Sequence, residues 1–463
     1  MSLLAIELSD AGIRAEGEKV LPTGSLSPSP GIAVMDDATL LIGREAADRA
    51  RLTPKRMNDR FWSELDTLPV GSPFPKELTL ADLAFSHLNL LWERLRPGVT
   101  QVILAIPGTY SERQMGLTLG IAKACRMPVH GLVDSAVAAS VTVATGARLL
   151  HLDLQLHRVV VTEIGRMGAE LVRTSVWTAD HVGLASLMAR WVRRIAGIFV
   201  NRTRFDPLHL AATEQEMYRR LPEWLRQLDR EGGAILEIPA AGKLHTVEVT
   251  RQDLEAAVSA EYEAIVHLVR SRKRFGERAA LLISDRLAGL PGLADRLADV
   301  GDTERTVLPE GAAPLGALGR REAILSPGTE LPFVTRLPGE PASFSPPAGV
   351  ATGRGKRPTH LVHDGRAHPI PLDPFLLGTA IPDGSHGINL SGPIAGISRS
   401  HCKLYRRQDR VLVEDHSSHG SFVNGQRVRG SVELVAGDRL RLGNPGIELQ
   451  VIAMVDPDGS TPD

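Results

Sequence analysis

Over the first two thirds of the chain, short apolar runs alternate with longer stretches in which apolar residues recur every three or four positions. A short continuous apolar run is typical of a strand buried on both faces, and the longer period is typical of a helix packed along one side. The alternation predicts an α/β fold with central sheets, in a segment long enough for two lobes. Strands are expected at residues 3–8, 101–106, 151–156, 159–164 and 279–284, and the clearest helices at residues 80–95, 111–125, 184–200 and 252–269.

The pattern changes after about Pro332. The next stretch is rich in Pro, Gly, Ala and Ser and has neither a helical nor an alternating period. Such a segment cannot bury enough apolar surface to order itself, so we expect a flexible linker. The predicted organisation is a first domain at residues 1–333, the linker at 334–357, a second domain at 358–455 and a disordered tail at 456–463.

The sequence pattern of the second domain is typical of an all-β fold. Its short β-prone runs are separated by Gly, Asp, Asn and Pro, which favour turns. Asn424-Gly425 predicts a two-residue hairpin because both residues tolerate a positive φ. We expect Phe422 and Val423 in the core of a compact β-sandwich. Its strands are expected near residues 375–378, 402–405, 411–414, 421–423, 439–442 and 447–452.

Charge and cysteine content narrow the class of protein. The 53 Lys and Arg nearly balance the 54 Asp and Glu, so no global field attracts nucleic acid or an anionic membrane, and an anion site must be local. Cys125 and Cys402 fall in different predicted domains, which argues against a disulfide framework or a cysteine-ligated metal. We see neither a signal peptide nor a membrane span and expect a cytoplasmic protein.

Two segments of the second domain are suited to bind one phosphate together. The first is Ser398-Arg399-Ser400-His401, and the second is the serine-rich stretch at residues 416–420; both are predicted to lie at strand ends. A phosphothreonine dianion needs several converging donors, and arginine is favoured because charge-assisted hydrogen bonds are roughly twice as strong as neutral ones. Loops at strand ends can supply hydroxyls, backbone N–H groups and a guanidinium without covering the ligand.

From about Pro358 to Val455, the chain resembles a forkhead-associated (FHA) domain, a β-sandwich that reads phosphothreonine. The resemblance implies that Ser398 contacts the phosphate, that Arg399 offers a guanidinium and that His401 supports the loop from below. It also implies structural roles in loops and turns for Gly378, Gly420, Asn424 and Gly425.

The chain departs from the FHA pattern in two places. The family's Gly-Arg is Gly378-Thr379 here, and its Thr-Asn is Ser418-His419. Loss of one charge-assisted contact costs about 1.5–3 kcal/mol, or about one to two decades of affinity. We place Thr379, Ser418 and His419 with the phosphopeptide-binding residues and expect Arg399 to compensate for the missing arginine.

Residues 102–140 resemble the strand–helix–strand segment of DnaK-type chaperone ATPases, members of the actin-like superfamily. Asp134 stands where that family keeps a carboxylate near the metal of the nucleotide. The resemblance covers about residues 1–331 and implies a two-lobed ATPase fold. The other matching segments follow the family's order: residues 4–15 and 151–164 for the two phosphate loops, 281–293 for the adenosine side and 311–319 for the closing helix.

The glycines that such an ATPase needs are absent from this chain. Glycine lets the backbone approach a phosphate closely, but the two phosphate loops read Glu-Leu-Ser-Asp-Ala at 7–11 and Asp-Leu-Gln-Leu-His-Arg at 153–158, and Ser-Asp replaces the adenosine-side Gly-Gly. We expect a degenerate pocket that does not turn over ATP, with its carboxylates solvated or in salt bridges. Its residues are Glu7, Ser9, Asp10, Asp134, Asp153, Gln155, Ser284 and Asp285.

These observations favour a non-catalytic adaptor. Its FHA domain captures a phosphothreonine-containing protein, and its DnaK-like pseudo-ATPase domain binds a further protein partner. One alternative is a divergent ATPase or chaperone that uses ATP and Mg²⁺ and is regulated by phosphopeptide docking. Another is an FHA fold that makes protein contacts without phosphate. The adaptor hypothesis implies no cofactor, metal, nucleic acid or membrane, and the pairing of the two modules suits a bacterial cytosol.

Overall fold

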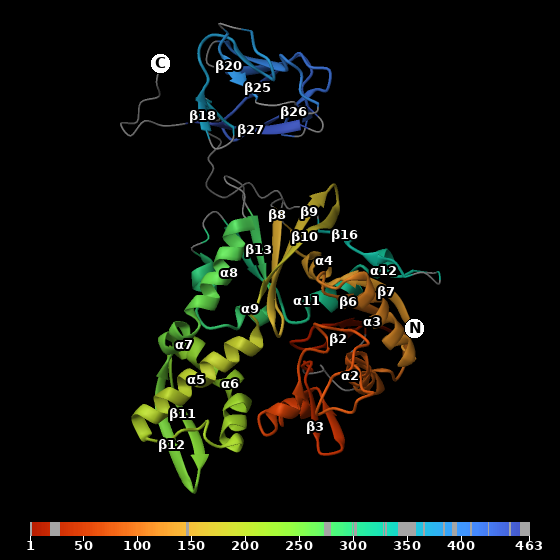
Figure 1. Ribbon diagram of the computed structural model, residues 1–463. Coiled ribbons are helices and arrows are strands. Elements are labelled where there is room, and N and C mark those ends of the chain that lie inside the picture. Colours follow the sequence, from red (N-terminus) through yellow and green to blue (C-terminus); the bar gives the residue numbers. More distant parts are fainter. Residues whose placement is uncertain are drawn as a thin grey trace. The chain divides into compact units, whose positions relative to one another are not determined.

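The chain forms two compact units, Met1–Phe344 and Ser345–Asp463 (Figure 1). The first is an α/β unit, and the described part of the second consists of strands, turns and loops. The computed structural model describes residues 2–18, 28–144, 148–272, 279–298, 300, 303–326, 328, 331–340, 358–363, 366–382, 385–390, 396–407, 410–424, 426–443 and 446–453.

A five-stranded sheet organises one part of the first unit. In sheet order its strands are β15 (Phe333–Val334), β7 (Val129–Asp134), β6 (Val99–Ile106), β1 (Ser2–Glu7) and β2 (Arg14–Gly17). The first four run parallel, and β2 pairs antiparallel with β1. Most positions of β1 are buried, as expected for a strand covered on both faces.

A six-stranded mixed sheet organises the rest of that unit. In sheet order its strands are β14 (Thr303–Val307), β13 (Ala279–Ile283), β8 (Arg148–Leu154), β9 (Arg158–Met167), β10 (Glu170–Asp180) and β16 (Arg336–Pro338). The strands β14, β13 and β8 are parallel, whereas β8, β9, β10 and β16 follow one another in antiparallel pairs. The carboxyl ends of β1, β8 and β13 carry residues of the predicted degenerate pocket.

Helices complete the cores of both sheets. They are α1 (Arg44–Ala47), α2 (Leu80–Leu95), α3 (Glu112–Ala124), α4 (Ser135–Ser140), α5 (Leu184–Thr203), α6 (Ala211–Glu231), α7 (Arg251–Ala257), α8 (Ser259–Arg272), α9 (Asp285–Ala288), α10 (Leu293–Ala298), α11 (Ala312–Gly319) and α12 (Arg321–Ile324). One core joins α2 and α3 to β1 and β6, and another joins α5, α6 and α8 to β8 and β9.

Helices α4 and α11 contribute to a third core that contains residues of both sheets. The two helices touch through their backbones, because a Cβ atom on Gly316 would lie 1.9 Å from the carbonyl oxygen of Ala138. The two sheets of the first unit therefore share this third core.

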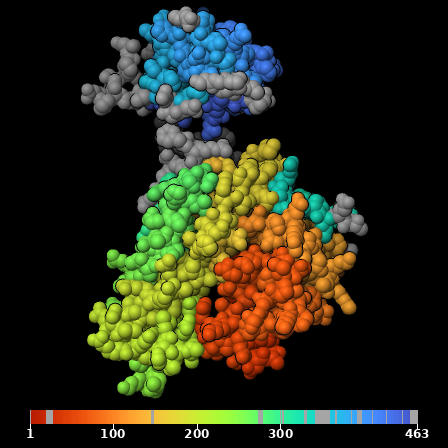
Figure 2. Space-filling model, viewed as in Figure 1, coloured from red at the N-terminus to blue at the C-terminus, as the bar shows by residue number. Residues whose placement is uncertain are grey.

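Smaller elements lie at the edges of the first unit. A three-stranded sheet is formed by β4 (Thr39–Ile42), β3 (Ala33–Asp36) and β5 (Met57–Asn58), next to the 3₁₀ turn η1 (Pro54–Arg56), and a hairpin is formed by β11 (Gly233–Ala240) and β12 (Lys243–Thr250). The hairpin packs against α5 and α6. In Figure 2 the surface is hollowed where the red N-terminal segment meets the yellow-green segment.

The second unit is a β-sandwich-like pair of sheets. One sheet has the order β18 (Arg366–Pro369), β17 (His360–His363), β27 (Gly446–Ile452), β26 (Arg439–Gly443), β23 (Ser421–Val423) and β24 (Gln426–Arg427), and the other has the order β20 (Gly387–Asn389), β19 (Phe375–Gly378), β21 (Cys402–Arg407), β22 (Arg410–Asp415) and β25 (Ser431–Leu434). Leu404 and Val413 from one sheet share a core with Leu440 and Val451 from the other.

Two predictions about these elements need correction. The helix expected at residues 252–269 is broken at Val258, whose φ of −121° leaves the helical range, and it forms α7 and α8 instead. Val423 is in the core as predicted, but Phe422 is half-buried outside it, with the Arg441 guanidinium 4.3 Å above its ring. Successive residues of a strand face opposite sides, so both could not point inward.

The start of the predicted linker also differs from the structure. Residues 336–338, which the sequence assigns to the linker, pair with β10 as strand β16, and Leu337 is fully buried. Residues 341–357 and the predicted tail at 456–463 lie outside the described residues. Within the described part of the chain, no helix has the length and apolar character that crossing a membrane requires.

Candidate functional sites

Three segments of the second unit meet at one end of its strands. Thr379 follows β19 and donates its N–H to the carbonyl of Ser398 at 3.2 Å, and Ala380 donates to the carbonyl of Arg399 at 3.0 Å. A Cβ atom at Gly378 would lie 1.9 Å from the Arg399 carbonyl oxygen, so the contact requires glycine. We call the segments 378–380, 396–401 and 416–420 together the crest.

His401 joins two segments of the crest from beneath. Its Nδ1 accepts the Ser398 N–H at 3.0 Å, and its Nε2–H donates to the Gly420 carbonyl at 3.2 Å. These two bonds require the neutral imidazole with its proton on Nε2. Burial lowers the pKa of His401 and favours that neutral form. The structural role predicted for this histidine fits this geometry.

The two predicted serines lie side by side on the crest. Their Oγ atoms are 3.5 Å apart, and the Ser418 N–H points to Ser398 Oγ at 3.4 Å. Ser418 Oγ also lies 3.2 Å from Nδ1 of His419, an exposed side chain. Two hydroxyls, a backbone N–H and an imidazole therefore converge where an anion could bind.

Asp415 holds the serine-rich segment in shape. Its Oδ1 accepts the Ser417 hydroxyl and the Ser421 hydroxyl, each at 2.8 Å, and Ser417 Oγ in turn accepts the Gly420 N–H at 2.7 Å. Burial acts against this carboxylate, but the hydrogen bonds from Ser417 and Ser421 lower its pKa overall. The sequence motif gave no role to Asp415, which directly precedes the serine-rich stretch, or to Ser417 within it.

The remaining predicted residues divide into exposed and structural ones. Arg399 is exposed, and no hydrogen bond or ion pair links its side chain to another described residue, whereas Thr379 is half-buried. Asn424 has a φ of 49° and fixes the β23–β24 hairpin through Asp438 and the Arg439 N–H. Gly425 lies outside the described residues.

Comparison with known proteins agrees with this geometry. Residues 378–443 match the family model of the FHA domain. The second unit contains an FHA domain. FHA domains bind phosphothreonine-containing proteins, so this match supports phosphothreonine-dependent protein interaction in general. No curated protein matches the chain.

The first unit has a charged cluster at the carboxyl ends of β1 and β8. Arg286 follows β13, and its guanidinium contacts Glu7 through two bonds of 2.9 and 3.0 Å and Asp153 through one of 3.2 Å. All three side chains are at most 14% exposed. Burial disfavours the charge of Arg286, but Glu7 and Asp153 outweigh this effect and raise its pKa. Two of the predicted carboxylates are therefore in a buried salt bridge.

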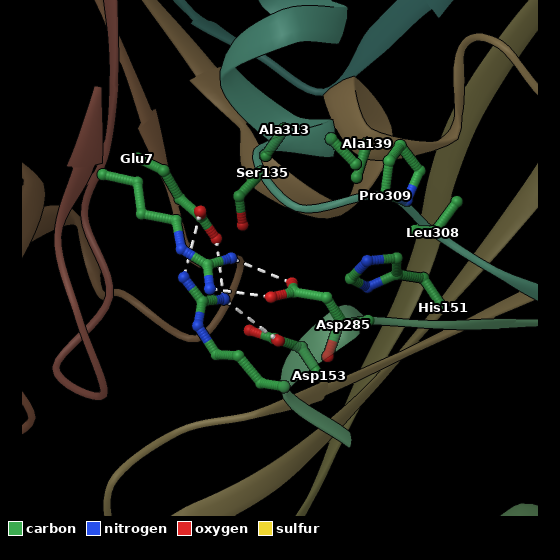
Figure 3. Close-up of a pocket in the computed structure, with 13 residues that line it drawn as sticks. Glu7, Ser135, Ala139, His151, Asp153, Asp285, Leu308, Pro309 and Ala313 are labelled. Atoms are coloured by element: carbon green, nitrogen blue, oxygen red, sulfur yellow. Dashed lines mark hydrogen bonds and ion pairs between the residues drawn. The ribbon is translucent and has the colours of Figure 1, made fainter. Parts of the chain in front are cut away.

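A second ion pair closes the same pocket. Arg14 from β2 binds Asp285 through two parallel bonds of 2.8 and 2.7 Å, and Figure 3 shows Glu7, Asp153 and Asp285 converging on guanidinium groups. Ser284 and His151 also line the pocket, whose open volume is about 20 Å³. That space accommodates about one water molecule. Arginine side chains thus occupy the pocket.

The other predicted pocket residues lie elsewhere. Asp10 and Gln155 line a separate small pocket, where Asp10 Oδ1 accepts the Leu156 N–H at 2.8 Å and burial raises the pKa of the Asp10 carboxyl. Ser9 is buried. Asp134 caps α4 through the N–H groups of residues 136 and 137 and binds Arg173 at 2.7 Å. The predicted residues are therefore divided between the two pockets, Ser9 and the cap of α4.

The environment of His401 predicts how it titrates. Because its folded pKa lies below the usual 6.5, the unfolded chain binds the proton first as the pH falls. The stability of the FHA domain should therefore be full above about pH 6.5 and decline below it. Nitrogen NMR of histidine side chains should show His401 as the Nε2–H tautomer, with a midpoint below 6.5; His401→Gln assigns the signal. A midpoint above 6.5 would contradict the hydrogen-bond assignment.

The buried salt bridge predicts a large effect of removing Arg286. Arg286→Ala leaves two desolvated carboxylates unpaired and should lower the free energy of unfolding of the first unit by about 3–5 kcal/mol. The control Arg113→Ala removes an exposed ion pair with Asp66 and should cost less than about 1 kcal/mol. All five tryptophans lie in the first unit, so their fluorescence during urea denaturation reports on it alone. Equal losses of unfolding free energy in the two variants would contradict a special contribution of the buried salt bridge.

Proposed function

We propose that the chain is a non-catalytic adaptor whose FHA domain captures a phosphothreonine-containing protein at the crest. The observation that carries this proposal is the pair of hydroxyls of Ser398 and Ser418, held 3.5 Å apart beside the exposed Arg399. A phosphate dianion can accept from both hydroxyls while it pairs with the guanidinium. His401 holds the two segments together without contacting the ligand.

The affinity of this site is expected to be modest. Thr379 occupies the position of the family's usual arginine, and its N–H is already bonded to Ser398. Arg399 then supplies the positive charge from the neighbouring segment, and His419 contributes a polar contact to the peptide. Because a lost charge-assisted bond costs about 1.5–3 kcal/mol, binding is expected to be about one to two decades weaker than at a crest that keeps the arginine.

We further propose that the first unit is a DnaK-like, actin-like domain that neither binds nor hydrolyses ATP and serves a protein partner in the cytoplasm. The support is chemical: in the pocket at the end of β1, Arg286 and Arg14 pair with Glu7, Asp153 and Asp285, and about 20 Å³ remains open. A flexible linker, such as the sequence predicts between the two modules, gives effective concentrations of about millimolar, so weak sites suffice for an adaptor.

The first test compares a phosphothreonine peptide library with its unphosphorylated twin. The full chain should bind the phosphorylated library at least about tenfold more tightly. Ser398→Ala combined with Arg399→Ala should abolish this preference. Arg410→Ala is the matched control, because it removes an exposed arginine at the end of β22 that lies away from the crest.

Two results would speak against the site. If the double variant kept the preference, the phosphate would bind elsewhere on the domain. If the wild-type chain bound both libraries equally, the FHA fold would serve protein contacts without phosphate. Fluorescence anisotropy at constant ionic strength separates these outcomes.

The second test concerns nucleotide. Addition of Mg-ATP should leave the thermal midpoint of the first unit unchanged, since a ligand that does not bind the folded state cannot stabilise it. Tryptophan fluorescence again reports on this unit. A rise in the midpoint that depends on ATP concentration would instead favour the divergent ATPase.

A further inference from the structure

One side of the crest carries cations that no motif explains. Arg427, on β24, lies opposite Phe422 in the hairpin. Its guanidinium reaches over the crest residue Gly420, because a Cβ atom there would lie 2.9 Å from Arg427 Nε and 3.3 Å from its Cζ. Gly420 has a φ of 84°, so two features require glycine at this position. The absent side chain leaves room for the arginine beside the serine-rich segment.

Arg429 extends the same cationic surface toward the crest. Val428 between the two arginines is buried in the core, and its N–H pairs with the Ser421 carbonyl at 2.8 Å. Because side chains alternate along an extended segment, Arg427 and Arg429 both point outward. Both are exposed, and among the described residues neither has a hydrogen bond or an ion pair.

The arginines of the neighbouring strand β26 do have partners. On β26, Arg439 pairs with Glu448 at 3.4 Å, and Arg441 stacks on Phe422 and lies directly opposite Glu448. Arg427 and Arg429, on the edge strand β24 and its continuation next to the crest, have no such partner among the described residues. Arg441 is accounted for by its stacking on Phe422. Arg427 and Arg429 have no comparable ring contact or ion pair within the described part of the chain.

We propose that the partner carries a second anionic group, a carboxylate or a second phosphate, and that Arg427 and Arg429 bind it. This inference rests on the proposed function, because the phosphothreonine at Ser398 and Ser418 sets the register of the peptide. Arg427 lies opposite Phe422, and its guanidinium reaches back over Gly420, so the second group binds beside the serine-rich segment. An extended peptide advances about 3.3 Å per residue, so peptides with the second anion two to four residues from the phosphothreonine cover the reach of both arginines.

The test uses the full chain and synthetic peptides of one length. A reference peptide contains phosphothreonine with neutral flanks. Two peptides add glutamates two to four residues away, on the C-terminal or the N-terminal side, and another carries a phosphoserine there instead. We expect at least one anionic peptide to bind about fivefold more tightly than the reference. Arg427→Gln with Arg429→Gln should remove this gain and leave the reference affinity unchanged.

Two further variants control for folding and for general charge. Arg427→Lys with Arg429→Lys keeps both charges and should retain most of the gain, and Arg410→Gln removes an exposed charge far from the crest and should retain all of it. A gain with phosphoserine alone identifies a second phosphate as the source. The inference is overturned if the reference and anionic peptides bind alike, or if the gain survives the glutamine variant. Failure of the proposed function looks different: the reference peptide itself would bind no better than its unphosphorylated twin.

Discussion

The pair of hydrogen bonds made by His401 is the constraint on which the recognition surface depends. One bond fixes the segment that carries Ser398, and the other fixes the segment that carries Gly420. The first segment precedes β21, and the second connects β22 of the same sheet to β23 of the other, so His401 holds the crossing between the two sheets against the neighbouring loop. A neutral, buried imidazole suits this role, since it donates on one side and accepts on the other without introducing a charge beneath an anion site.

The first unit also joins separate segments through one side chain, but it uses a buried ion pair in place of a neutral imidazole. Arg286 joins the six-stranded sheet to Glu7 at the end of β1, so a buried charge links elements of two sheets. Burying these charges costs desolvation free energy, but removing one partner costs more, because it leaves a buried charge unpaired. The ion pair therefore favours a fixed arrangement of the two sheets.

Much of the fold was accessible from the sequence because its signals are local. The helix at residues 80–95 has the predicted bounds, and Ser111 caps α3 through a side-chain bond to Gln114. The FHA motif indicated the crest residues because turns there need particular glycines and hydroxyls. The alternation along β23 was overlooked, which misassigned Phe422. The partners of Glu7 and Asp153 could not be predicted, because Arg286 lies 279 and 133 residues away in the chain.

The close approach at Gly378 has a consequence for how this surface can change over time. The spacing of the loops is set by main-chain contacts to Ser398 and Arg399, by one glycine and by one buried imidazole. The exposed side chains of Arg399 and His419 take no part in these contacts. Substitutions at these two positions therefore leave the loop spacing in place, so the outer surface can diverge among descendants of this chain while the scaffold beneath stays constant.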